Sequence, residues 1–207
     1  NFSPSVTSYH VVGNVTQDRA LKALETLNTQ WSAKEVTMPE YSLPESSDKA
    51  GLYFVDIPQA KQSVINIGYL AMARTDPEYY ASTVMNYKLG GSFSGNLNLI
   101  LREEKGYTYG ARSGFSGNKI PGAFTASSSV RTNTTYESTK IFMEEMEKYR
   151  DGISQEDLDF TKNALIKSNA RRFETFYSLI GMLETRSAYD FEADYIKGEE
   201  DIIRNMT

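Results

Sequence analysis

Residues 89–110 read LGGSFSGNLNLILREEKGYTYG, and this stretch contains two breaks that set the local fold. The pair Gly90-Gly91 is expected to end one helix, because glycine accepts the left-handed backbone that terminates a helical run. Gly106 should end the next helix in the same way. Between these glycines, apolar residues recur at steps of three and four, which predicts a helix with one buried face: Phe93, Leu97, Ile100 and Leu101.

A strand is predicted directly after Gly106. Its every second residue is apolar or small, as on one face of a strand: Tyr107, Tyr109, Ala111, Ser113 and Phe115. Arg102 therefore lies in the last full turn of the helix, and Tyr109 lies early on the strand that turns back from it. A corner of this kind, helix, glycine and strand, can bring a guanidinium and a phenol to one point.

The same stretch resembles the pitrilysin/insulinase family of zinc peptidases. The resemblance rests on GGxF at 90–93 and on LREEKGxxY at 101–109, and it extends from Val11 to about Tyr195. It is a resemblance to the second, zinc-lacking domain of that family's two-domain half. The sequence departs from the family at Gly95-Asn96, where Ser-Arg is common.

The resemblance also implies a role for two side chains. In the family, an arginine and a tyrosine at the positions of Arg102 and Tyr109 reach a zinc site on another domain and contact the substrate backbone there. It therefore implies that Arg102 and Tyr109 are catalytic residues of a peptide-hydrolysis site. The zinc is expected in a partner domain or subunit, and the expected substrate is a peptide.

Strands are predicted at four further places: 8–12, 52–57, 63–72 and 123–131. Several of them are joined by short turns, which favours antiparallel pairing. With the helices between and after them, they predict an α+β fold. We expect a two-layer sandwich, in which one mixed, mostly antiparallel sheet is covered on one face by helices. The resemblance implies the same architecture.

Helices are predicted from their capping residues. Thr16 precedes the first, Asp76 precedes another, and Ser154 precedes a third. Thr134 and Glu137 are spaced as a capping box, and Gly152 is expected to end the helix that they begin. Two helices close the chain, at 176–189 and from about 193. The first helix should bury a stripe of four residues: Leu21, Leu24, either Leu27 or Asn28, and Trp31.

Composition is that of an ordinary globular domain, and we expect one domain over residues 1–207. The net charge of −5 argues against a nucleic-acid surface, and no apolar run approaches the ~20 residues of a transmembrane segment. The absence of cysteine leaves the compartment open, including a periplasmic or other extracytoplasmic one. Because residue 1 is not methionine, we expect a piece of a longer chain.

The sequence holds one histidine and no cysteine. A catalytic zinc site takes three protein ligands, two of them histidines in the inverted zinc motif, so this chain is not expected to hold zinc or another cofactor. His10 is interpreted as a structural or edge residue of the first strand. The same count leaves no Ser–His pair for nucleophilic catalysis.

Three interpretations remain open at this point. The first is a zinc-lacking domain of a zinc peptidase that supplies Arg102 and Tyr109 to a site completed elsewhere. The second is an inactive partner or an assembly subunit with the same fold, although retention of both side chains speaks against it. The third is an unrelated α+β binding module whose motif match is fortuitous.

Overall fold

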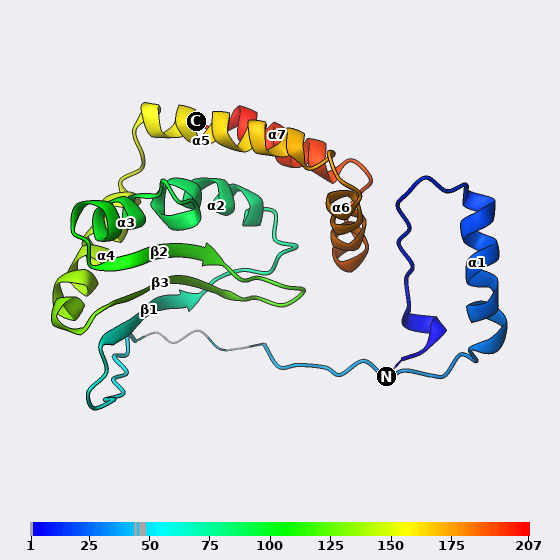
Figure 1. Ribbon diagram of the computed structural model, residues 1–207, viewed down its shortest axis with the longest axis horizontal. Coiled ribbons are helices and arrows are strands. Elements are labelled where there is room, and N and C mark those ends of the chain that lie inside the picture. The colour runs from blue at the N-terminus through cyan, green and yellow to red at the C-terminus, as the bar shows by residue number, and fades with distance from the viewer. Residues whose placement is uncertain (1, 44, 46–48) are drawn as a thin grey trace. The chain divides into compact units, whose positions relative to one another are not determined.

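The computed structural model describes residues 2–43, 45 and 49–207 (Figure 1). They fall into two compact units, one of residues 1–42 and 167–198 and one of residues 43–166 and 199–207. The second unit contains the sheet and the stretch 89–110. The expectation of a single domain over 1–207 stays a prediction.

The second unit is built on a three-stranded antiparallel sheet of order β1-β3-β2. Its strands are Gln62–Leu70 (β1), Thr108–Phe115 (β2) and Ala123–Arg131 (β3). Three predicted strands are therefore confirmed, at 63–72, 107–115 and 123–131. Together with the helices they confirm the α+β fold. Because β3 is central, β2 is an edge strand of this sheet.

Two predicted strands are wrong: neither 8–12 nor 52–57 forms a ladder in the described structure. The segment 52–57 is rich in strand-forming residues, yet Leu52 and Tyr53 are 95% and 93% exposed. Strand propensity is realised only where a residue packs against cross-strand neighbours. Here a turn closed by the Ala60 N–H and the Ile57 carbonyl, 3.2 Å apart, returns the chain towards β1 without such pairing.

Helices cover one face of the sheet (Figure 1). Tyr79–Asn86 (α2) continues as a π-helical turn over Tyr87–Gly91 (η2), and Asn96–Asn98 (α3) continues as a second one over Leu99–Glu104 (η3). These elements pack on β2. Thr135–Arg150 (α4) follows a short 3₁₀ turn and packs on β3 and β1. The prediction of a sheet covered on one face thus holds for this unit.

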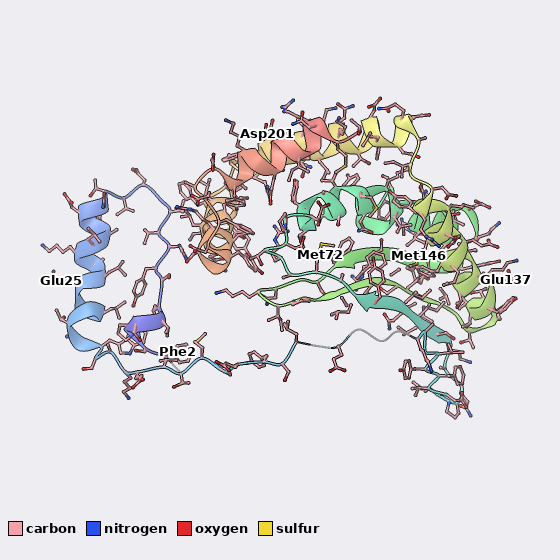
Figure 2. The ribbon with its side chains drawn as sticks, turned by 180° about the vertical axis from the view of Figure 1, so that it is seen from behind. Phe2, Glu25, Met72, Glu137, Met146 and Asp201 are labelled. Atoms are coloured by element: carbon pink, nitrogen blue, oxygen red, sulfur yellow. The ribbon has the colours of Figure 1, made fainter. Side chains whose placement is uncertain are left out.

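The core of the second unit lies between the sheet and these helices. The side chains of Leu97, Leu101 and Phe142 are completely buried, against strand residues that face inward: Ile65, Ala111, Phe124, Ala126 and Val130. Met146, labelled in Figure 2, packs against this core from α4, whereas Glu137 in the first turn of the same helix is exposed.

The predicted helix ends are mostly correct. Gly106 and Gly152 end their helices with positive φ, +62° and +99°. Thr16 caps Gln17–Gln30 (α1) and Ser154 caps Gln155–Arg171 (α5) through their hydroxyl groups, as predicted. The capping box is wrong, because the Thr134 hydroxyl donates to the Arg131 carbonyl at 2.8 Å within the 3₁₀ turn Thr132–Thr134 (η4) and makes no cap.

The helix Gln155–Arg171 (α5) is joined to η2 by an ion pair within the second unit. Lys88 Nζ lies 3.1 Å from Asp157 Oδ1 and 5.1 Å from the centre of the Phe160 ring. Burial by itself would raise the pKa of Asp157, but the bonds from Lys88 and Ser154 outweigh it and hold this pKa below its usual value. The pair therefore fixes the first turns of α5 onto the turn that carries the glycine pair.

The same helix also holds the end of the chain. Lys162 Nζ donates to the carbonyls of Arg204 and Met206, at 2.7 and 2.9 Å, at the end of Tyr195–Asn205 (α7). The Ile203 side chain is completely buried in that last segment.

The first unit contains Pro4–Val6 (η1), Gln17–Gln30 (α1) and Phe176–Tyr189 (α6). The expected buried stripe of α1 is not buried: Leu21 is 58% exposed and Trp31 is half-buried. The stripe instead lines a pocket of about 700 Å³ with Pro4 and Tyr9. The side chain of Asn28 lies outside the described residues. His10, predicted to be structural, is half-buried in irregular chain.

Tyr149 gives a test of how α4 packs against α2 in the second unit. Its hydroxyl donates to the Met85 carbonyl at 2.6 Å, and burial, with the Asp157 charge second, raises the pKa of Tyr149 to about 12. A tyrosine in an unfolded chain has a pKa of about 10. Between about pH 10 and pH 12 the unfolded chain loses this proton while the folded chain keeps it, so the free energy of unfolding should fall as pH rises. Urea unfolding at a series of pH values measures this slope.

Two variants identify the source of the slope. Tyr149→Phe should flatten it, whereas Tyr136→Phe, at an exposed position of the same helix, should leave it as in the wild type. Equal slopes for the wild type and Tyr149→Phe would contradict the assignment.

Candidate functional site

A pocket of about 720 Å³ opens at the edge of the sheet in the second unit. It is lined by the end of η2 and the turn after it, by Asn98, by the start of β2, and by residues of β1 and β3 that, except for the buried Ser128, lie on the face of the sheet opposite the helices. Tyr109 lines this pocket, and its side chain is 91% exposed. One of the two predicted site residues therefore lies at a concave surface.

A β-bulge takes Tyr109 out of the regular alternation of β2. Thr108 pairs with Val130 and Ala111 pairs with Ser128, so three steps along β2 match two steps along β3. One extra residue in a strand bends it and leaves the ladder locally unpaired. Tyr109 and Gly110 consequently face away from the core, between two inward positions. The prediction that Tyr109 shares the face of Ala111 is wrong for this reason.

Side-chain hydroxyls hold the bulge. Thr108 Oγ1 donates to the Ser129 carbonyl at 2.7 Å and accepts from the Gly110 N–H at 3.1 Å. Ser128 Oγ donates to the Gly110 carbonyl at 2.9 Å. These bonds satisfy backbone groups that the broken ladder leaves unpaired, so the backbone at Tyr109 is fixed while its ring stays free.

Two buried asparagines attach β2 to the helices. Asn98 Oδ1 accepts from the Ala111 N–H at 3.2 Å, and Asn98 Nδ2 donates to the Phe93 carbonyl at 2.8 Å. Asn86 Nδ2 donates to the Ser113 carbonyl at 3.0 Å and Asn86 Oδ1 accepts from the Ser113 hydroxyl at 2.5 Å. Asn98 thus joins the strand directly after the bulge to the turn that carries Phe93.

Gly90 is required by a close approach rather than by its backbone angles. A Cβ atom at this position would lie 2.6 Å from the Ser113 backbone nitrogen, and φ is not positive at Gly90 or Gly91. The helix does end at the glycine pair as predicted, but through a π-helical turn and not through a left-handed residue. The missing side chain allows η2 to lie directly on β2.

Arg102 reaches the pocket only through its neighbour. Its guanidinium carbon lies 4.5 Å from the centre of the Phe93 ring, and Nε lies 3.4 Å from Glu103 Oε1. Phe93 lines the pocket, whereas Arg102 does not. The structure therefore places Arg102 and Tyr109 on elements that Asn98 ties together, without a direct bond between the two side chains.

Sequence reasoning missed both asparagines. Each stands in an apolar helical stretch, after Leu97 in one case and close to Val84 in the other, and both are nearly fully buried. A buried amide must find partners, so an Asn at a core position of a helix is a signal for an anchor to a neighbouring backbone.

The residues that the structure describes do not fit a catalytic zinc. Among the side chains that the structure describes, no group of three His, Cys, Asp or Glu could hold a metal ion. The one histidine, His10, belongs to the first unit, outside the unit that carries the pocket.

No helix in the described residues has the length and apolar character needed to cross a membrane.

Comparison with known families identifies the class. The family model described as the peptidase M16 inactive domain matches residues 1–165. Because this covers most of the chain, the chain belongs to that family of zinc-protease-like domains. The zinc-peptidase resemblance of the stretch 89–110 is thereby confirmed.

Individual relatives agree with this assignment. An uncharacterized zinc protease of Streptomyces coelicolor is 28% identical over 101 residues, which are 48% of this chain and 22% of that protein. The peptidase M16 inactive domain from Pseudomonas fluorescens shares the fold with a TM-score of 0.82 and 24% identity, covering 94% of this chain and 46% of that one. A protease from Helicobacter pylori gives 0.84 and 17%, covering 95% and 48%. The chain thus spans about a fifth of the curated relative and about half of each structure.

Proposed function

We propose that this chain is the substrate-contacting, zinc-lacking domain of a zinc metalloendopeptidase. In this proposal it supplies Arg102 and Tyr109 to a peptide-hydrolysis site that a zinc-bearing domain or subunit completes. The observation that carries the proposal is the bulge that leaves the Tyr109 ring 91% exposed at a pocket while a hydrogen-bonded backbone fixes its position.

The chemistry of the two side chains supports this role. Peptide hydrolysis passes through a tetrahedral intermediate whose oxygen gains negative charge, and donors aimed at that oxygen lower the barrier. A phenol O–H is one directional donor, and a guanidinium presents a fork of N–H groups to a substrate carbonyl. The exposed Tyr109 hydroxyl makes no hydrogen bond within the described structure, so it can donate to a substrate without first breaking one.

The placement of Arg102 also suits a substrate contact. The Phe93 ring supports the guanidinium by a cation–π contact, which restricts a long and otherwise mobile side chain. Holding the fork in advance reduces the conformational entropy that binding would cost. A peptide bound in the pocket along β2 would contact Tyr109 and, beside it, the turn that carries Phe93.

Separation of the two parts of the enzyme tests the proposal. This chain alone should take up no stoichiometric zinc and cleave no peptide, because it lacks the ligands. The zinc-bearing part alone should retain its metal and cleave poorly. Mixing the two should restore hydrolysis, measured with a quenched fluorescent peptide. Hydrolysis that is independent of this chain would favour the alternative function, an assembly or structural subunit.

A further inference from the structure

We infer that Arg112 forms a carboxylate-binding subsite of the pocket, which selects peptides that carry a carboxylate about three residues from the scissile bond. This inference rests on the proposed function and adds a substrate class to it. The carboxylate can belong to an Asp or Glu side chain or to the free C-terminus of the peptide.

The charge distribution of the pocket is the first support. Of the described residues that line it, Arg112 carries the only charge, and no acidic side chain lines it. Arg112 is exposed, and it forms no ion pair with any described residue. Arg102, which does not line the pocket, is by contrast already paired with Glu103 and stacked on Phe93. An unpaired guanidinium in a pocket without acids attracts a carboxylate from a ligand.

The register of the sheet supplies the second support. Arg112 pairs with Ser127, and Ser127 pairs with Asn66, so these three residues form one row across the three strands. All three line the pocket. The helices of this unit cover the other face of the sheet (Figure 1). Neighbouring strands lie about 4.8 Å apart, so a guanidinium, a hydroxyl and an amide adjoin one another there. Each can donate to a carboxylate oxygen.

The distance to Tyr109 fixes where that carboxylate must lie. The bulge turns Tyr109 to the same outer face as Arg112, three residues away along β2, which is about 10 Å in an extended strand. A bound peptide in extended form covers the same length in about three residues. If the Tyr109 hydroxyl marks the scissile carbonyl, the recognised carboxylate lies about three positions from it.

Peptide binding to the complete peptidase, freed of metal by chelation, tests the subsite without catalysis. The first set of fluorescein-labelled peptides would have an amidated C-terminus and would carry one Glu or, in the matched peptide, one Gln. This residue would be placed in turn at each of the four positions on either side of the scissile bond. A second set would carry a free or an amidated C-terminus at the same distances. Fluorescence anisotropy gives the Kd of each. The first set reports a side-chain carboxylate and the second an α-carboxylate.

The wild type should bind the carboxylate peptide of one set about tenfold more tightly than its neutral partner, at a position about three residues from the scissile bond. Arg112→Gln should remove this preference and leave the Kd of neutral peptides within about twofold, and Arg112→Lys should keep part of it. Arg131→Gln is the matched control, because Arg131 is exposed on β3 about 13 Å from the Arg112 row and lines no part of the pocket. It should keep the full preference.

The inference is overturned if Arg112→Gln weakens carboxylate and neutral peptides equally, or if the wild type shows no preference in either set. Thermal melts exclude loss of folding as the cause. Failure of the proposed function has a different signature, because it shows in the turnover of Tyr109→Phe and leaves the ratio of the two Kd values unaffected.

Discussion

Replacing Tyr109 by phenylalanine in the complete peptidase should lower turnover at saturating peptide by about 100-fold, or roughly 3 kcal/mol of barrier, the loss expected for one donor to a developing oxyanion. The KM should change little, because the donor acts on charge that exists only in the transition state. The free energy of unfolding should not change, because the Tyr109 ring is exposed and its hydroxyl makes no hydrogen bond within the described structure.

Two companion variants give the result its meaning. Tyr107→Phe removes the same hydroxyl two residues away, on a ring that packs towards the core, and should leave turnover within about twofold of the wild type. Arg102→Ala should raise KM as well as lower turnover, because a guanidinium held on the Phe93 ring can grip a carbonyl in the ground state. Unchanged turnover in Tyr109→Phe at saturating peptide would remove Tyr109 from the catalytic residues.

Sequence patterns predicted the elements that their own residues determine. The helix stops at Gly106 and Gly152 depend on left-handed backbone, which glycine alone adopts easily, and both stops occur. The caps at Thr16 and Ser154 are equally local, because the hydroxyl bonds an N–H three residues on. The strand 123–131 was predicted to its end residues.

Elements that depend on distant partners were predicted poorly. The segment 52–57 has the composition of a strand but no pairing, and the apolar stripe of α1 is partly exposed. The capping box failed because Thr134 has a competing acceptor, the Arg131 carbonyl, in a turn that the residue pattern does not reveal. In each case the deciding contact lies outside the pattern that was read.

The candidate site, too, was predicted only in part from the sequence. The spacing of Arg102 and Tyr109 indicated their elements, but the face that Tyr109 occupies depends on one extra residue in β2 relative to β3. Strict alternation places Tyr109 beside Ala111, facing inward. Only the register between the two strands, which no single strand encodes, turns the ring to the pocket. The anchors that attach β2 to the helices, Asn86 and Asn98, were likewise visible only with both strand and helix in place.

Asn98→Leu should therefore lower both the stability of the fold and the activity of the complete peptidase. Leucine keeps the volume of the side chain but leaves the buried Ala111 N–H and the Phe93 carbonyl without their partners. Each unsatisfied group costs about 1–3 kcal/mol, so for the two groups the free energy of unfolding of this chain, measured by urea denaturation, should fall by roughly 2–6 kcal/mol. In the complete peptidase, turnover should fall and KM should rise together, because the strand after the Tyr109 bulge and the Phe93 support of Arg102 both lose their common attachment.

Asn86→Leu is the matched control for that result. It removes an equivalent pair of buried bonds, both to Ser113, from the same strand and should lower stability by a similar amount. Ser113 lies four residues beyond Tyr109 and lines no part of the pocket, so turnover per folded molecule should stay close to that of the wild type. If the two variants lose turnover equally at equal loss of stability, Asn98 only holds the fold together. A kinetic defect confined to Asn98→Leu would instead identify it as the residue that positions Tyr109 and Phe93 for substrate.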